Sequence, residues 1–129
     1  MEYMTPAVIE ARESSASSEV RSFPVARLDL DEEVRQMRAS PKPGGHLGKT
    51  LVHNADLRIV LMLLDRGTRI PRHHAKGSLT IQTLDGRVIA AMLDSSFDLG
   101  PGQVLAIDRD VSHALVAIED SALLLTIAH

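Results

Sequence analysis

The sequence predicts an all-β domain, a sandwich or a barrel, preceded by one short helix. From residue 47 onward, short apolar segments alternate with turns that are rich in Gly, Asp and Ser. No helical pattern interrupts these segments, which disfavours a parallel α/β fold. The helical pattern that the chain does contain lies earlier, within residues 27–39.

Composition limits the classes of function. The chain has 129 residues, which predicts one domain, and its 44% hydrophobic and 24% charged residues are ordinary for a globular protein. Aromatic residues make up only 2%, so the core must be aliphatic. A net charge of −3 and few aromatic side chains argue against nucleic-acid binding, which needs a positive surface or stacking platforms.

The absence of cysteine excludes disulfides, zinc–thiolate sites and thiol nucleophiles, and it fits a cytoplasmic location. No apolar run approaches the ~20 residues that span a bilayer. The first twenty residues contain four Glu and lack the pattern of a secretory signal. We therefore expect a cytoplasmic protein with no membrane or nucleic-acid partner.

Three regions are expected: a flexible N-terminal arm over 1–22, a short helix with its connector over 23–46, and the barrel over 47–129. Serines cluster in the arm as they do in linkers. Asp29 or Asp31 can cap the helix. Leu30, Val34 and Met37 follow the spacing of a single apolar stripe, which predicts that the helix lies against the sheet.

Within the barrel region, the aliphatic run Leu57–Leu64 predicts a strand buried on both faces. Asp85-Gly86 is a hairpin turn signal, so Leu79–Leu84 and Arg87–Leu93 are expected to pair. Ser112–Ile118 and Ala122–Ile127 are expected to form the last pair.

Histidines accompany two of these segments. His73 and His74 precede one strand, and His113 begins another. Side chains alternate between the two faces of a strand, so an inward His113 places Leu115 inward as well. The same alternation puts Leu79 and Ile81 inside and Gln82 outside, unless the strand is bulged.

Residues 47–128 resemble the cupin superfamily, whose two motifs occur here in order. Gly67, His73 and Gly86 match the first motif, which runs Gly, five residues, His-x-His, Glu and a closing Gly. Gly102 and His113 match the second motif, although Asp108 replaces its usual Pro and Asp110 its usual Gly. The resemblance implies a double-stranded β-helix, or jelly-roll, barrel.

The first motif also departs from the family pattern. With His73 as the first histidine, the second falls on Ala75; with His74 as the second, the first falls on Arg72. The usual Glu falls near Leu79, which binds no metal. Adjacent strand residues face opposite sides unless a bulge re-aims them. The spacing from Ile70 favours His73 as the inward histidine.

Two interpretations of the histidines remain. His73, His74 and His113 are candidate ligands of a divalent transition metal (Zn, Fe, Mn, Ni or Cu). Alternatively, they are a residual polar group in a barrel that holds no metal. Arg72 either forms an anion-binding site with its basic neighbours His74 and Lys76 or is a solvated turn residue. The candidate ligand-binding residues are Arg72, Leu79, Ile81, Gln82 and Leu115.

Two functions from different classes follow. The first is a metal-dependent oxygenase or isomerase acting on a small organic molecule. The second is a non-catalytic module that binds or senses a small ligand in the same pocket. Cupin-like barrels often pair, and the apolar segments 57–64 and 123–127 offer surface for a second copy, so a homodimer is expected.

Overall fold

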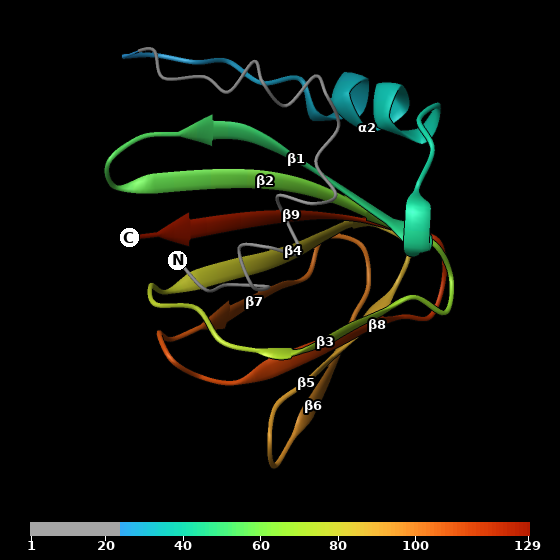
Figure 1. Cartoon of the computed structure of the whole chain (residues 1–129), viewed down its shortest axis with the longest axis vertical. Helices are drawn as coiled ribbons and strands as arrows, with labels where there is room; N and C mark the ends of the chain where they lie inside the picture. Colours follow the sequence, from blue (N-terminus) through green and yellow to red (C-terminus); the bar gives the residue numbers. More distant parts are fainter. Residues whose placement is uncertain (1–23) are drawn as a thin grey trace.

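The computed structural model describes residues 24–129, and the predicted arm over 1–22 lies outside them. The described chain forms two antiparallel β-sheets with one α-helix above them (Figure 1). The predicted all-β architecture with a short preceding helix is confirmed. The strands are β1 (His46–His53), β2 (Leu57–Leu64), β3 (Arg69–His73), β4 (Leu79–Asp85), β5 (Val88–Ala91), β6 (Ser96–Leu99), β7 (Val104–Ile107), β8 (His113–Ala117) and β9 (Ser121–Ala128).

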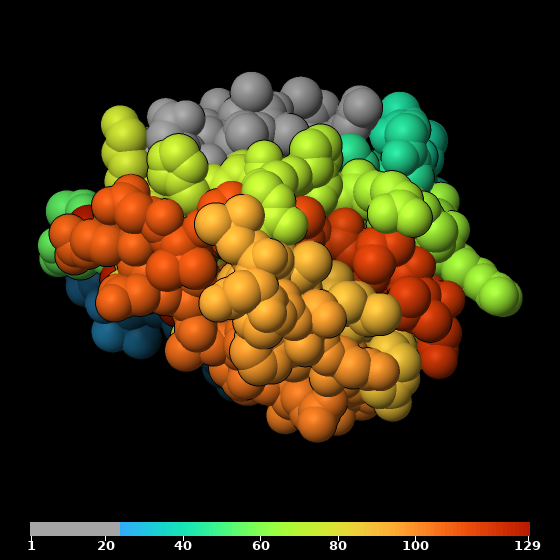
Figure 2. Space-filling view, turned by 90° about the horizontal axis from the view of Figure 1, so that it is seen from below, coloured from blue at the N-terminus to red at the C-terminus, as the bar shows by residue number. Residues whose placement is uncertain are grey.

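The two sheets face each other across one core. Sheet A has the strand order β1-β2-β9-β4-β7, and sheet B has the order β3-β8-β5-β6. Figure 2 views the molecule from the side of sheet B, with β3 in yellow-green and the β5–β6 region in orange. The core between the sheets is aliphatic, as the composition predicts, and every strand except β1 contributes to it.

The helix α2 (Leu30–Arg38) begins and ends where its sequence indicates. Of the two candidate caps, Asp29 is used: its carboxylate accepts a hydrogen bond from the backbone N–H of Glu32 at 3.1 Å. Acidic residues occupy the first turn and basic residues the last, which complements the helix dipole. The 3-10 helix η2 (Pro43–Gly45) then leads into β1.

The apolar stripe of α2 packs on the outer face of sheet A. Met37 is buried there with Leu61 and Leu63 of β2, and Leu30 and Val34 pack around them. Beside this contact, the ammonium of Lys49 donates to the Glu33 carboxylate at 2.7 Å. Leu57–Leu64 is therefore buried on both faces, as predicted. Its outward side chains Leu61 and Leu63 face α2 of the same chain.

Truncating Met37 tests this packing. Its side chain is 2% exposed, so Met37→Ala leaves a cavity beneath the helix. We expect a loss of about 2 kcal/mol in the free energy of unfolding, at the low end of core truncations because a helix over a sheet can partly collapse. Urea denaturation measures this loss. An unchanged midpoint would mean that α2 does not dock on sheet A in solution.

Two predicted strand pairings are wrong. Asp85-Gly86 joins β4 in sheet A to β5 in sheet B, where β5 pairs with β6 and β8. Likewise, β8 and β9 lie in different sheets and pair with other strands. The turn residues mark a change of direction correctly, but here the chain crosses from one sheet to the other instead of folding back beside itself.

The barrel also begins one residue earlier than predicted, at His46. The register of β1 against β2 pairs His46 with Leu64, and Leu64 belongs to the core between the sheets. His46 therefore lies on the inner wall and is buried. Within residues 24–129, no helix is long and apolar enough to cross a membrane.

Candidate functional site

Two histidine side chains meet on the inner wall of sheet B. His73 ends β3 and His113 begins β8, and their Cα atoms are direct partners in the antiparallel pairing of these strands. The ring centroids lie 4.3 Å apart, with an angle of 67° between the ring planes. His113 is fully buried, and His73 is 7% exposed. The sequence therefore brings two imidazoles into contact inside the barrel.

An irregularity in β3 makes this contact possible. Ile70 pairs with Leu115, so a regular strand would place Arg72 opposite His113. The register instead shifts between Ile70 and His73, which puts His73 opposite His113 and leaves Pro71 and Arg72 exposed. Proline cannot donate a ladder hydrogen bond and is tolerated at bulges and on edge strands, and β3 is an edge strand.

Each ring is oriented by the backbone of its own strand. Nδ1 of His73 lies 2.6 Å from the carbonyl oxygen of Pro71, and Nδ1 of His113 lies 2.9 Å from that of Val111. A carbonyl only accepts hydrogen bonds, so both Nδ1 atoms carry the proton and donate it. In a neutral imidazole, Nε2 then holds the lone pair. The Nε2 atoms of both rings are buried.

Burial keeps these imidazoles neutral. The pKa of His73 is lowered to about 4, mainly by desolvation and to a lesser degree by the adjacent His113 and His74, against the opposing effect of the Pro71 hydrogen bond. Desolvation also lowers the pKa of His113, and the positive charge of Arg72 acts in the same direction. At neutral pH, the inner wall therefore presents two imidazoles in the form that binds metals.

The donor chemistry fits a transition metal, but the number of protein ligands is small. Metal-binding histidines commonly donate their second ring N–H to a carbonyl or carboxylate, as both rings do here. Catalytic zinc sites usually have three protein ligands. Among residues 24–129, no group of three or more His, Asp or Glu side chains is arranged to hold an ion. The pair thus fits a two-histidine site that water or a ligand would complete.

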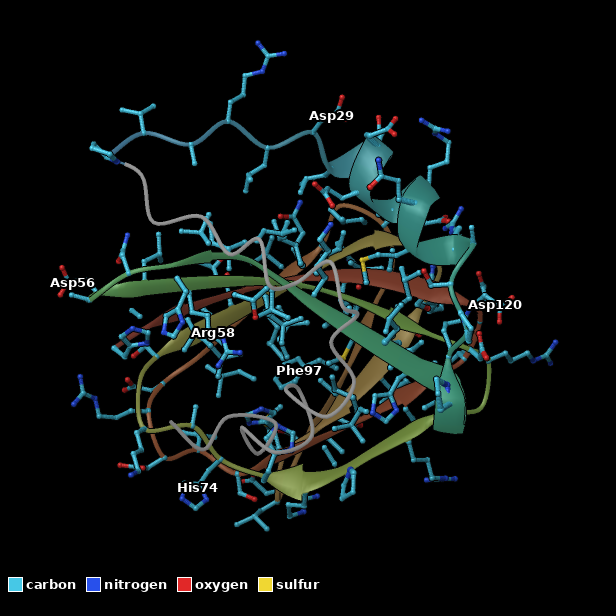
Figure 3. The ribbon with its side chains drawn as sticks, turned by 45° about the horizontal axis from the view of Figure 1, so that its top comes forward. Asp29, Asp56, Arg58, His74, Phe97 and Asp120 are labelled. Atoms are coloured by element: carbon cyan, nitrogen blue, oxygen red, sulfur yellow. The ribbon has the colours of Figure 1, made fainter. Side chains whose placement is uncertain are left out.

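The remaining predicted site residues separate into inner and outer groups. His74 is exposed and lies on the outside of the molecule (Figure 3). Arg72 is also exposed, and its guanidinium lies 3.4 Å from the carbonyl oxygens of Ala91 and Met92. Gln82 faces outward from sheet A and is only half-buried. The structure brings none of these three side chains onto the inner wall with the histidine pair.

The apolar candidates do face inward. Leu79, Ile81 and Leu115 are all buried in the core between the sheets, as the alternation of each strand predicts. Thr83 continues the inner face of β4, where its hydroxyl donates to the carbonyl oxygen of Leu99 at 3.2 Å. The inner wall near the histidines is therefore mainly aliphatic.

Sequence reasoning missed polar residues on the opposite wall. Arg58 of β2 is 5% exposed, and its guanidinium donates to the hydroxyl of Thr50 on β1 at 3.0 Å. Arg58 points from β2 into the space between the sheets (Figure 3). A signal was present, because Arg58, Val60 and Met62 occupy alternate positions, and the latter two face the core.

Comparison with solved structures identifies the architecture. A conserved protein of unknown function from Streptococcus pyogenes matches with a TM-score of 0.68 at 27% identity, over 84% of this chain and 92% of that one. A cupin superfamily protein from Desulfitobacterium hafniense matches with a TM-score of 0.70 at 19% identity, over 85% and 97%. KdgF from Halomonas matches with a TM-score of 0.62 at 24% identity, over 69% and 82%.

No protein-family model matches the sequence, and no curated protein matches it. The solved structures therefore give the similarity of fold. Two antiparallel sheets that enclose one core, with the chain crossing between them after β2, β3, β4, β6, β7 and β8, define a jelly-roll barrel. The described barrel has the fold of the cupin structures that it matches. The predicted cupin barrel is confirmed, while the roles of its histidines stay predictions.

Proposed function

We propose that the protein binds a small molecule inside the barrel, at a divalent transition metal held by His73 and His113. The observation that carries this proposal is the contact between two buried imidazoles whose Nδ1 atoms both donate to backbone carbonyls. In that tautomer, Nε2 of each ring carries the lone pair through which an imidazole binds a metal. Two protein ligands leave coordination positions for water and for the small molecule.

The ion belongs to the group Zn, Fe, Mn, Ni or Cu, because neutral imidazole suits all of these metals. Bound there, it would supply Lewis acidity to the ligand that completes its coordination. The protein's own contribution is to hold the two rings and to surround them with aliphatic side chains. An oxygenase or isomerase would use the open positions for substrate.

A metal-free binding module is the second candidate. The small number of protein ligands favours this candidate. Residues 24–129 place no further imidazole and no carboxylate beside the two histidines to make a three-residue metal site. In that case the imidazoles contact the small molecule directly through Nε2. We expect the protein to act as a homodimer in either case, and light scattering at micromolar concentration tests this.

Metal titration of the untagged, EDTA-treated protein separates the two candidates. We expect Ni²⁺ or Zn²⁺ to raise the unfolding temperature, since an ion at 100 times its Kd stabilises the folded state by about 2.7 kcal/mol. His113→Ala should abolish metal uptake, because one imidazole alone is a weak site.

His74→Ala is the matched control, because His74 neighbours the pair but is exposed on the outside. It should retain the full metal response. Wild-type protein that takes up no metal and gains no stability from any of the five ions would exclude the metal site and leave the metal-free module.

A further inference from the structure

The helix α2 covers only part of the outer face of sheet A. The apolar cluster beneath it centres on Met37 and on Leu61 and Leu63 of β2. On the other half of this sheet, β9, β4 and β7 lie side by side (Figure 1). Alternate residues of these strands belong to the core between the sheets, so the residues between them point outward. Six outward residues form what we call the uncharged strip: Thr80, Gln82, Val104, Ala106, Leu124 and Thr126.

The register of the three strands aligns the uncharged strip in two rows, because β4 pairs with β7 on one side and with β9 on the other. On each strand, the residue of the first row is smaller than that of the second. A hollow of about 440 Å³ lies over the smaller row, and the larger row does not line it. The smaller row is Ala106, Thr80 and Thr126, and the larger row is Val104, Gln82 and Leu124.

No residue of the uncharged strip is charged, although 24% of the chain's residues are. The outer face of sheet B differs, because the exposed Arg69 of β3 and Asp98 of β6 lie on it. A sheet face open to water is commonly polar, whereas the centre of a protein interface is depleted of charged residues. Val104 is nevertheless 54% exposed on this strip. The strip therefore has the composition of an interface centre.

We infer that the uncharged strip is the centre of a dimer interface, where a second copy of this chain packs face to face about a two-fold axis running between the two rows. Such an axis exchanges the rows, so the larger row of each copy fills the hollow over the smaller row of the other. Val104 of one copy then faces Ala106 of the other. This inference deepens the homodimer expected with the proposed function, and it requires neither metal nor ligand.

Polar chemistry at the middle of the strip favours a second copy over an apolar partner. The Gln82 amide and the Thr80 hydroxyl can each both donate and accept a hydrogen bond. Exchange of the rows places Gln82 of each copy opposite Thr80 of the other, so the symmetry supplies two amide–hydroxyl hydrogen bonds. A purely apolar partner would cover these groups without pairing them, which is costly.

The size of the strip indicates how much else must take part. Six outward positions occupy about 200 Å² of sheet, whereas a standard interface buries about 800 Å² on each partner. The strip therefore supplies the centre and needs a rim. The flank of α2 is the adjacent candidate, because Leu30 and Val34 of the helix line a second hollow with Leu84 of β4 on the same side of the sheet.

Sedimentation equilibrium of the full chain tests the inference. We expect a wild-type dimer at micromolar concentration. Val104→Lys and Ala106→Glu should each raise the dimer Kd at least about tenfold, because each buries an unpaired charge against the other copy. Ile118→Glu is the matched control, since Ile118 is also an exposed aliphatic residue, at 40%, but follows β8 of the other sheet. It should keep the wild-type Kd.

Mixing the two variants tests the geometry itself. If Val104 faces Ala106 of the other copy, an equimolar mixture of Val104→Lys and Ala106→Glu brings the two opposite charges together in one contact and restores the original side chains in the other. The mixture should therefore dimerise at least about tenfold more tightly than either variant alone. If either variant fails to fold, Gln82→Glu changes only the amide and should still raise the dimer Kd several-fold.

The outcomes separate this interface from the other proposals. A monomeric wild type overturns both the interface and the expected homodimer. A wild-type dimer that is indifferent to Val104→Lys and Ala106→Glu, or equally weakened by Ile118→Glu, overturns the interface and leaves the homodimer standing. Variants that dimerise no better when mixed overturn the pairing of the rows. A dimer that responds as expected in a protein without Ni²⁺ uptake supports the interface and overturns only the metal site.

Discussion

Acidification of the metal-free protein from pH 7 to pH 4 is expected to destabilise it in a way that depends on His73. In the unfolded chain, histidine titrates near its ordinary pKa of about 6.5. In the folded protein, burial lowers the pKa of His73 to about 4. Between these values the unfolded state binds more protons, so the free energy of unfolding falls as the pH falls.

The contribution of His73 is complete above about pH 6.5 and is lost progressively down to about pH 4. Its size is at most about 3 kcal/mol, since each pKa unit corresponds to about 1.4 kcal/mol. His113, whose pKa is also lowered by burial, adds to the effect in the same direction. Urea denaturation at pH 7, 6, 5 and 4.5 with EDTA measures the slope.

The matched variants isolate the histidine contribution from that of the carboxylates. His73→Gln removes the titrating group, so its stability should depend less steeply on pH over this range. His74→Gln changes an exposed neighbour and should keep the wild-type slope. Identical slopes for the wild type and His73→Gln would contradict the burial of a neutral imidazole at position 73.

Local signals predicted the elements of this fold well. Asp29, the acidic first turn and the apolar stripe ending at Met37 all lie within one segment, and the helix forms where they indicate. The run Leu57–Leu64 is long enough to require burial on two faces, and the structure provides both faces. In each case, the residues that decide the outcome are neighbours in sequence.

Pairing between strands was predicted less well, because it depends on residues far apart in the chain. Asp85-Gly86 has the chemistry of a tight turn, which fixes the local backbone but not the sheet that the next strand joins. The structure resolves this through long-range contacts: the carbonyl of Arg87 accepts from the N–H of Ile118 at 2.9 Å. The crossing β4–β5 connection is thus held by the turn between β8 and β9.

The candidate site could be predicted only in part, because it too depends on contacts between residues far apart in the chain. Strand alternation correctly predicts that His113 points inward. His73 lies opposite His113 only because the register shifts beside Pro71. A single proline is compatible with an edge, a bulge or a strand end, so the shift itself is not encoded locally. Arg58 was missed because a charged residue within an aliphatic run suggests a solvated strand end, whereas this residue shares the face of β2 that lies between the two sheets.

Gly86→Ala is expected to be strongly destabilising, and it tests the crossing connection directly. Gly86 has a φ of +86°, a region that costs an alanine about 1 kcal/mol or more. A Cβ there would also overlap the carbonyl oxygen of Asp120 and the hydroxyl of Ser121, and would lie 2.7 Å from the Cα of Ser121. Two of these three atoms belong to the backbone, which cannot easily move away.

Ser121 cannot give way without further loss. Its hydroxyl accepts from the N–H of Arg87 at 3.0 Å and donates to the carbonyl oxygen of Glu119 at 2.7 Å, so it joins the two turns. We therefore expect Gly86→Ala to cost about 3 kcal/mol, the sum of backbone strain and overpacking. Chemical denaturation measures the loss of stability.

Gly67→Ala provides the control that separates strain from steric overlap. Gly67 has the same φ of +86°, but an added Cβ would meet no atom within 4 Å. It should therefore lose only about 1 kcal/mol, the backbone contribution alone. Equal losses for the two variants would mean that the β4–β5 connection does not pack against the turn before β9. Gly86, the closing glycine of the first motif, would then be required for its backbone conformation and not for the close approach of the two sheets.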